Sequence, residues 1–331
     1  MAMAAVIHEK GPPEVFRWEE IELAPPGEGE VQVRNTAIGV NYVDTYHRRG
    51  LPHPWPVPAL PLILGFEGGG VVEEVGPGVS DFARGDRVAY LLPPHGAYAQ
   101  MRNYPAEKLL AVPDGVDDQT VAAVVLKGMT AQYLLRRTYR VGLGDTILVH
   151  AAAGGMGLIL CQWGKKLGAT IVGTVSTDEK AELAAANGCD YSVVLGRDDF
   201  AKTVREVTDG MGCDVVYESI GKDTFQKSLE CLRPMGMLVS YGHASGAPDP
   251  VDVIEDLGAR GSLVLTRPTL MHYMADKVDR ETSARELFNA LESGVVKARI
   301  GQVYPLRSVA QAHRDIEQRR TTGSTVLLPF E

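Results

Sequence analysis

The sequence predicts an α/β protein built from two parts: a compact, mostly antiparallel, barrel-like β domain and a parallel sheet covered by helices on both faces. Three observations lead to this prediction. The chain has 331 residues, which corresponds to about two domains. The region before Pro113 reads as short strands separated by turns, and the region after it reads as strands and helices in alternation.

The N-terminal part is expected to form the barrel-like domain. Segment 30–40 (EVQVRNTAIGV) alternates apolar and polar residues, which is typical of a half-buried strand. Further strands are expected at 71–75 and 86–92, separated by the turn-rich segment GPGVSDFARG. Five prolines between residues 52 and 61 exclude a helix or a central strand, so this segment is expected to be a loop.

The following part is expected to form the parallel sheet. A proline-free apolar pattern predicts a helix over 117–137. Strands are then expected at 146–150, 170–175, 192–195, 214–218 and 237–241, and helices at 156–167, 178–187, 198–208 and 223–232. Such repetition indicates βαβ units. The remaining chain predicts helices at 285–293 and 309–319 and a final strand at 324–328.

Composition narrows the class of protein. The net charge is −9, and no basic run of five or more residues occurs, which argues against a nucleic-acid partner. No 18-residue apolar stretch and no signal-peptide pattern is present, so we expect no membrane span. The four cysteines are too widely spaced for a disulfide framework or a Cys-x-x-Cys metal site, and a reducing cytoplasm fits them best.

The strongest chemical signal is the segment Ala151–Gly157 (AAAGGMG). It follows the apolar strand TILVH and opens a helix, and Ala152, Gly154 and Gly157 occupy the three positions of a G-x-G-x-x-G motif. Such a loop needs small residues because the backbone must approach a pyrophosphate closely, at a helix N-terminus that attracts anions. The alternative is a tight turn that binds nothing. We expect a dinucleotide site.

The residues after the second strand bear on the choice between NAD and NADP. Asp178 lies at about the distance at which a carboxylate grips the adenosine ribose of NAD. The segment Ser176–Glu179 also reads as a helix cap with acidic residues in the first turn, which is the interpretation we favour for Asp178 and Glu179. Lys180 and Ser176 are then expected to meet a 2′-phosphate, which favours NADPH, although Lys180 is alternatively a solvated surface lysine.

The sequence shows no cysteine or histidine spacing that is typical of a metal site. The first 160 residues contain no cysteine, and His8, His47, His53, His95 and His150 are scattered without a metal-binding spacing. A hydride-transfer reaction needs no metal when the acceptor is electrophilic, because the cofactor supplies the chemistry and the protein supplies position and dryness.

Several segments together resemble one family over nearly the whole chain. They are AIGVNYVDTYHRRGL (37–51), GFEGGGVVEEVGPGV (65–79), GDRVAY (85–90), LKGMTAQYLL (126–135), HAAAGGMGLILCQW (150–163) and TRPTL (266–270). The chain resembles the zinc-independent quinone oxidoreductases of the medium-chain dehydrogenase/reductase superfamily.

The resemblance implies a GroES-like domain formed by residues 1–124 and 268–331 and a six-stranded, doubly wound Rossmann domain formed by residues 125–267. In zinc-dependent relatives, a cysteine and the histidine of a Gly-His-Glu motif hold catalytic zinc. Asn41 stands at the cysteine position and Phe66 at the histidine position of Gly65-Phe66-Glu67. The structural zinc lobe is also missing, so the resemblance and the residue patterns both imply a metal-free site.

The resemblance also implies a set of site residues. Asn41, Tyr46 and Arg267 are expected to be catalytic: Asn41 binds a cofactor or quinone oxygen, Tyr46 stacks on the acceptor or donates to an oxyanion, and Arg267 adds positive charge. Some of these residues also have a structural alternative. Tyr42 and Tyr46 lie four residues apart, so on a helix one of them is alternatively a core residue. Arg267 is alternatively part of a surface ion pair, and Glu67 alternatively has only a structural role. The cofactor-binding residues are expected to be Asn41, Tyr42, Thr130, Ala152, Gly154, Gly155, Met156, Gly157, Ser176, Lys180, Gly242, His243, Ser245, Thr266 and Arg319.

One position departs from the family pattern. Relatives carry a tyrosine at the end of the third Rossmann strand, against the adenosine phosphate, whereas this chain has Leu195. Arg197 is a candidate to compensate at a 2′-phosphate. The departure weakens the NADPH assignment without overturning it.

The expected reaction is therefore hydride transfer from NADPH to a quinone, without a metal. A reductase of α,β-unsaturated carbonyls (enones) is the alternative enzyme, and a non-enzymatic NADPH- or RNA-binding protein is the alternative class. The sequence names neither the physiological acceptor nor the one- or two-electron outcome. The resemblance also implies a homodimer, and the apolar run at 262–266 is consistent with an edge strand that pairs across a two-fold axis.

Overall fold

The computed structural model describes residues 1–51 and 57–331, and within them the chain divides into two compact units. Unit 1 contains residues 1–129, 274–292 and 298–331, and unit 2 contains residues 130–273 and 293–297. In the described part of the chain, no helix is long and apolar enough to cross a membrane.

Unit 1 is built on two β-sheets, and β3 (Glu30–Val40) has the predicted bounds. The other elements are β1 (Ala2–Ile7), β2 (Phe16–Ile21), α1 (Tyr42–Arg49), β4 (Leu62–Ile63), β5 (Glu67–Val75), β6 (Arg87–Tyr90), β7 (Met101–Pro105), β8 (Leu110–Ala111), α8 (Lys277–Glu292), β15 (Ile300–Pro305), α9 (Val309–Glu317) and β16 (Ser324–Leu328).

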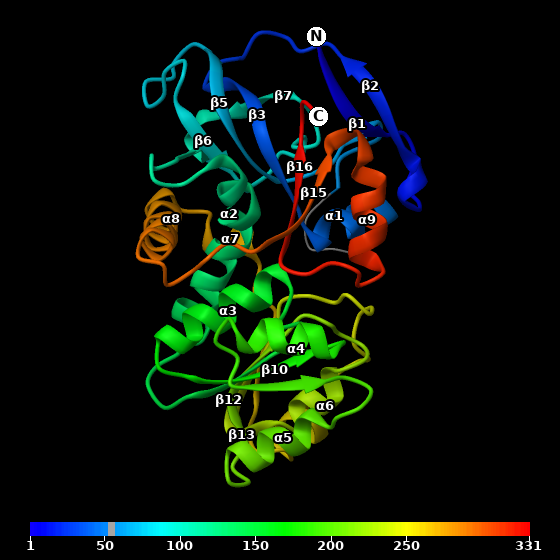
Figure 1. Cartoon of the computed structure of the whole chain (residues 1–331), viewed down its shortest axis with the longest axis vertical. Helices are drawn as coiled ribbons and strands as arrows, with labels where there is room; N and C mark the ends of the chain where they lie inside the picture. The colour runs from blue at the N-terminus through cyan, green and yellow to red at the C-terminus, as the bar shows by residue number, and fades with distance from the viewer. Residues whose placement is uncertain (52–56) are drawn as a thin grey trace. The chain divides into compact units, whose positions relative to one another are not determined.

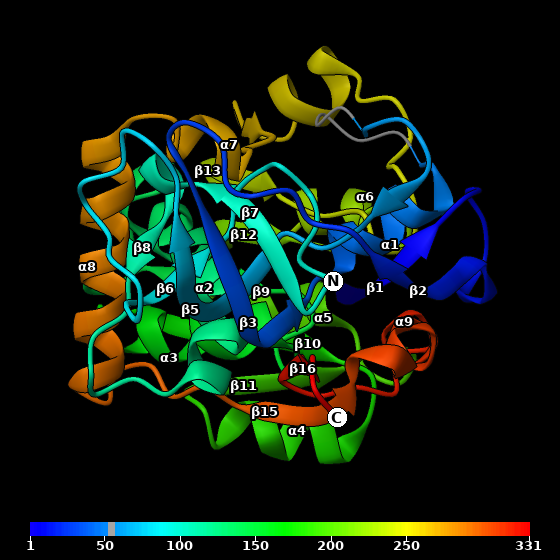
Figure 2. The ribbon, with the colours of Figure 1, turned by 90° about the horizontal axis from the view of Figure 1, so that it is seen from above.

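The larger sheet of unit 1 is the mostly antiparallel domain that the sequence predicts. Its order is β15-β16-β3-β5-β6-β8, with β7 paired to β3, and only β15 and β16 run parallel. Figure 2 shows β3 beside both β5 and β7. The smaller sheet has the order β2-β1-β4. Apolar side chains of both sheets, with those of α9, form one buried core.

Unit 2 is the predicted doubly wound domain. Its sheet is entirely parallel, with the order β11-β10-β9-β12-β13-β14, which is the strand order of a Rossmann fold. The elements are β9 (Thr146–Val149), α3 (Gly155–Lys166), β10 (Thr170–Val175), α4 (Asp178–Ala185), β11 (Tyr191–Val194), α5 (Phe200–Val207), β12 (Cys213–Glu218), α6 (Phe225–Leu229), β13 (Leu232–Ser240), β14 (Val264–Thr266) and α7 (Leu270–Tyr273).

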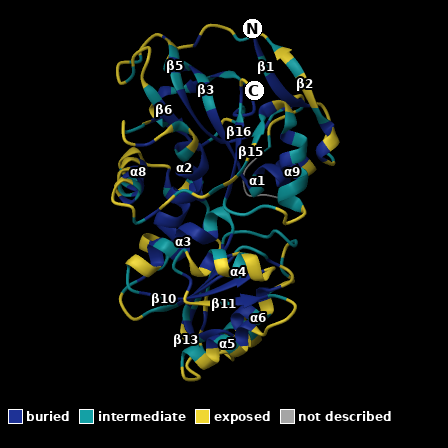
Figure 3. Ribbon diagram, in the orientation of Figure 1, coloured by how far each residue is buried: buried dark blue, intermediate teal, exposed yellow. Residues whose placement is uncertain are grey.

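Helices cover both faces of this sheet, with α3 and α4 on one side and α5 and α6 on the other (Figure 1). Apolar residues of α5 and α6 form a core with strand residues such as Leu148, Val172 and Val216. Figure 3 shows that the central strands of the sheet are mostly buried, while the outer surfaces of α4 and α5 are exposed. The helix α2 (Asp118–Tyr133) begins in unit 1 and ends in unit 2.

Most predicted elements are confirmed to within a few residues, but two predicted helices need correction and some strands were missed. The helix expected at 223–232 is only α6, because Leu232 already pairs with Cys213 and starts β13 ahead of a bulge. The helix expected at 285–293 is α8, which starts earlier because the Asp276 carboxylate accepts the N–H groups of its first turn. Strands β1, β2 and β15 were not predicted.

The structure describes part of the proline-rich segment 52–61. Residues 52–56, with three of its prolines, lie outside the described residues, and 57–61 form neither helix nor strand, as expected.

Candidate active site

The predicted phosphate loop lies between β9 and α3 in unit 2. Gly154 is the N-cap of α3 in an extended conformation, and Gly155 is the first helical residue. The first N–H groups of such a helix have no intrahelical acceptor, so they face the loop opening as donors for an anion. A hydrogen bond of 2.9 Å from the Ala152 N–H to the Thr174 carbonyl fastens the loop to β10.

The loop fits a dinucleotide because its small residues are sterically required. A Cβ at Gly157 would lie 2.3 Å from the Ala151 oxygen and 2.6 Å from the Ala152 Cα. A Cβ at Gly173, on β10 beneath the loop, would lie 2.7 Å from the Ala152 Cβ. These glycines therefore let α3 and β10 approach the loop backbone closely, which is the geometry a pyrophosphate site demands.

The candidate adenosine end lies at the end of β10. Thr177 caps α4 by accepting the Lys180 N–H, and Asp178 and Glu179 occupy the first helical turn, so the predicted cap is confirmed. Ser176 is exposed and Lys180 is half-buried in the same turn. Their assignment to a 2′-phosphate stays a prediction.

Arg197 lies at the same end of the sheet, two residues after Leu195, which directly follows β11. Its guanidinium donates to Asp178 at 2.7 Å and to Asp198 at 3.1 Å. Both carboxylates offset its charge, which makes Arg197 poorly suited to attract a phosphate. Sequence patterns gave no sign of this pairing.

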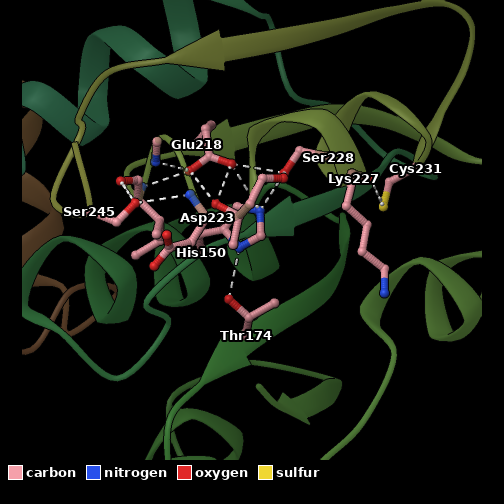
Figure 4. A network of polar contacts seen from close by, with 11 residues as sticks. His150, Thr174, Glu218, Asp223, Lys227, Ser228, Cys231 and Ser245 are labelled. Carbon is pink, nitrogen blue, oxygen red and sulfur yellow. Dashed lines mark hydrogen bonds and ion pairs between the residues drawn. The ribbon is translucent and has the colours of Figure 1, made fainter. Parts of the chain in front are cut away.

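Behind the loop lies a buried polar network that the sequence did not predict (Figure 4). The His150 ring contacts the Thr174 hydroxyl through Nδ1 and the Ser228 hydroxyl through Nε2, both at 2.8 Å. The Glu218 carboxylate accepts the Ser228 hydroxyl at 2.8 Å and also the Thr224 hydroxyl.

The hydrogen bonds of this network assign the His150 tautomer. Ser228 donates to Glu218, so it accepts from Nε2–H of His150, and Nδ1 accepts the Thr174 hydroxyl. Burial lowers the pKa of His150, which outweighs the opposing effect of Glu218, so the ring is neutral at pH 7. Because His150 directly precedes the phosphate loop, the network fixes the loop to β10, β12 and α6.

Several predicted residues gather where β13 and β14 end. The Arg267 guanidinium donates to the Ser240 carbonyl at 2.8 Å and to Nδ1 of His243 at 3.3 Å. Burial and the Arg267 charge lower the pKa of His243, so it accepts this bond as a neutral ring. Arg267 is thus held by a carbonyl and an imidazole at this end of the sheet.

The neighbouring predicted residues occupy the same end of the sheet. The Ser245 hydroxyl donates to the Ile220 carbonyl and accepts the Asp223 N–H, which joins the turns after β12 and β13. Gly242 is packed tightly, since a Cβ there would lie 2.7 Å from the Ser219 oxygen, and Thr266 ends β14.

In unit 1, the predicted aromatic pair lies on α1. The Tyr42 and Tyr46 rings meet edge to face, with centroids 5.4 Å apart. Tyr46 is buried, at 5% exposure, whereas Tyr42 is half-buried, so Tyr46 has the surroundings of a core residue. Thr130, the first residue of unit 2, is also buried, and Arg319 is exposed after α9.

Asn41 belongs to a buried charged cluster with Glu67 and Lys127. The Glu67 Oε2 accepts both the Asn41 Nδ2 and the Lys127 Nζ at 2.8 Å, and the Leu126 N–H donates to Oε1 at 2.7 Å. Gly39 makes room for this carboxylate, because a Cβ there would lie 2.3 Å from Oε2. Lys127 was not predicted as a site residue; its place in the segment KGMT was the only available signal.

A second buried network supports α1. The Asp44 carboxylate accepts the Asn41 N–H and the Tyr98 hydroxyl, and burial raises the pKa of Asp44 to about 7. The Tyr98 hydroxyl also contacts His313. These bonds connect the start of α1 to α9 within unit 1 and fix the Asn41 backbone.

Two histidines lie next to Phe66. Nδ1 of His47 is 2.8 Å from Nε2 of His95, and the Phe66 ring packs on His95 with centroids 4.1 Å apart. Burial lowers the pKa of His47 to about 3 and that of His95 to about 4, so both are neutral at pH 7. Within residues 1–51 and 57–331, no three His, Cys, Asp or Glu side chains gather in a way that could hold a metal ion.

The fold and the loop define a class, the nicotinamide-dinucleotide-dependent dehydrogenases/reductases with a mostly antiparallel β domain and a Rossmann domain. Residues 27–142 match the alcohol dehydrogenase GroES-like domain family, and residues 155–287 match the zinc-binding dehydrogenase family.

Individual proteins narrow this class. The chain is 56% identical to a 2-haloacrylate reductase of Burkholderia over 99% of each chain, and 49% identical to a quinone oxidoreductase of Pseudomonas aeruginosa over 96% of this chain and 97% of that one. The crystal structure of Escherichia coli quinone oxidoreductase with NADPH is similar, with a TM-score of 0.95 and 42% identity over 99% of this chain and 100% of that one. The chain therefore belongs to the quinone oxidoreductases of the medium-chain dehydrogenase/reductase superfamily, and its cofactor is NADPH.

Proposed function

We propose that this oxidoreductase reduces a quinone with NADPH and without a metal. The observation that carries the proposal is the cluster of Asn41, Glu67 and Lys127. The carboxylate that would serve a metal site is already saturated by an ammonium and an amide, both at 2.8 Å. Asn41 and Lys127 thus supply polar donors for an acceptor oxygen.

The pyrophosphate and the adenosine end of the dinucleotide are proposed to bind unit 2. The N–H groups around Ala152, Gly154, Gly155, Met156 and Gly157 hold the pyrophosphate. Ser176 and Lys180 bind the 2′-phosphate. The remaining proposed cofactor contacts are Asn41, Tyr42, Thr130, Gly242, His243, Ser245, Thr266 and Arg319.

The reduced nicotinamide supplies the hydride. The residues of this chain position the acceptor and accommodate the charge that develops on its oxygen. Asn41 is proposed to hydrogen-bond the acceptor oxygen, Tyr46 to contact its ring, and Arg267 to contribute positive charge. The buried surroundings of Asn41 and Tyr46 exclude water, which strengthens such contacts.

Reduction of an α,β-unsaturated carbonyl is the second candidate. The relative named 2-haloacrylate reductase favours it, because that name describes reduction of an activated carbon–carbon double bond. The same hydride donor and the same oxygen-binding groups would serve both reactions.

A kinetic panel separates the two candidates. NADPH and NADH are each combined with benzoquinone, a naphthoquinone, a simple enone and 2-chloroacrylate, with and without a chelator. We expect NADPH-dependent quinone reduction that the chelator leaves unchanged. Turnover of the enone or chloroacrylate alone would favour the second candidate, and inhibition by the chelator would contradict the metal-free site.

We also propose a cytoplasmic homodimer. β14 forms one edge of the parallel sheet, and Val264 on it is exposed, so its backbone is open to pairing with a second copy. All four cysteines are buried free thiols, which fits a reducing compartment.

A further inference from the structure

The Lys127 side chain is buried and has more N–H donors than hydrogen-bond acceptors around it. It lies on α2 at 7% exposure, and within residues 1–51 and 57–331 the Glu67 carboxylate is its one hydrogen-bond acceptor. An ammonium has three N–H groups, so two remain for a ligand. Burying such a group without further partners is costly, which indicates a role beyond the ion pair.

The Glu67 carboxylate positions the Lys127 ammonium and occupies only one of its three N–H groups. Glu67 Oε1 accepts the Leu126 N–H, and Oε2 accepts both Asn41 and Lys127. Three donors converge on one carboxylate, and Gly39 provides the space that it needs. Lys127 and the proposed oxygen-binding residue Asn41 therefore point toward the same carboxylate oxygen and lie side by side.

We propose that Lys127 is a catalytic residue that contacts the acceptor oxygen and protonates it. This inference rests on the proposed function. Bound NADPH would supply a hydride to the acceptor, and an electron pair would then move onto the acceptor oxygen, next to Lys127. The Lys127 N–H bond then breaks as an O–H bond forms, giving the hydroquinone from a quinone or the enol from an enone. The neutral amine regains its proton from water.

If Lys127 has this role, quinones and enones should depend on it to different extents. A hydroquinone anion spreads its charge over an aromatic ring, so it needs little help from a cation. An enolate carries more localised charge and is far more basic, so its formation depends more strongly on a nearby proton donor. Lys127 therefore extends the reactivity of the site from quinones to enones.

The test compares Lys127→Met with wild type and with Lys127→Arg, which keeps the charge. Lys108→Met is the matched control, because Lys108 also lies in unit 1 but donates to the Pro93 carbonyl at 3.1 Å rather than to a carboxylate. We expect Lys127→Met to slow enone reduction about 100- to 1,000-fold, the usual effect of removing an oxyanion donor, and quinone reduction about tenfold or less. Lys108→Met should slow neither.

A spectroscopic measurement tests the contact without turnover. 4-Nitrophenol resembles the hydroquinone anion, and its anion absorbs visible light. Wild-type protein and Lys127→Arg should lower the pKa of bound 4-nitrophenol, whereas Lys127→Met should not. Thermal melting with and without NADPH reports whether each variant folds and binds cofactor.

The outcomes separate this inference from the proposed function. Equal slowing of enone and quinone by Lys127→Met, or an unchanged nitrophenol pKa in wild-type protein, would overturn the role of Lys127. Failure of the wild-type protein to reduce any acceptor with NADPH would overturn the proposed function itself. If Lys127→Met does not fold, the folded Lys127→Arg variant decides. Arginine keeps the charge but does not give up a proton, so enone reduction at the wild-type rate in this variant would be the contrary result.

Discussion

The substitution Gly157→Ala should damage the phosphate loop selectively. The added Cβ would lie 2.3 Å from the Ala151 oxygen and 2.6 Å from the Ala152 Cα, and both are backbone atoms that no rotamer change can remove. Real Cβ contacts essentially never fall below 3.0 Å, so the loop must move by at least about 0.7 Å. Such overpacking costs about 1–3 kcal/mol of stability.

The displaced loop should also bind NADPH more weakly. A hydrogen bond to a charged group contributes about 1.5–3 kcal/mol, so losing one amide–phosphate contact weakens binding roughly 10- to 100-fold. The melting temperature should fall by about 3–10 °C. Isothermal titration with NADPH and a thermal melt measure both effects.

Gly164→Ala is the matched control on the same helix. Its Cβ would meet only the ends of two side chains, the terminal methyl groups of Ile147 and Ile171, at 3.0 and 3.1 Å, and no backbone atom. The Gly-to-Ala change itself favours the helix by about 0.5–1 kcal/mol, so stability and NADPH affinity should change little. The reasoning is wrong if Gly157→Ala binds NADPH within threefold of wild type.

Two further predictions concern cofactor choice and pH. Lys180→Ala should weaken NADPH about tenfold or more while leaving NADH unchanged, because only NADPH carries the 2′-phosphate; an unchanged ratio of kcat/KM for the two cofactors would reject this contact. Stability should fall as the pH drops below about 6.5, because the unfolded chain then takes up protons at His47 and His95 that the folded protein binds only near their pKa values of about 3 and about 4. Asp44 acts in the opposite sense: with its pKa raised to about 7, the folded protein takes up this proton first, so acid stabilises through it and Asp44→Asn should steepen the loss. Urea unfolding at pH 7 and pH 5 measures the slopes, and a flat or inverted profile would contradict the assignment.

The sequence by itself determined the local structure and the kind of cofactor. Period-2 alternation marked β3, the alternating apolar strands and helices marked the Rossmann sheet, and AAAGGMG marked the turn between β9 and α3. These signals are readable because backbone geometry and steric limits act over a few neighbouring residues. Strands β1, β2 and β15 escaped prediction because their pairing partners, rather than their own patterns, stabilise them.

Only the tertiary structure decided which polar side chains meet. Glu67 and Lys127 lie 60 positions apart in the chain, and His150 and Ser228 lie 78 apart, yet each pair is in hydrogen-bond contact. The same holds for Arg197, whose pairing with Asp178 depends on two adjacent parallel strands ending together. The physical reason is that polar side chains meet only where the fold brings donors and acceptors from several elements to one point, and no local pattern records that convergence. For the buried pairs, this convergence is also what offsets the cost of burial.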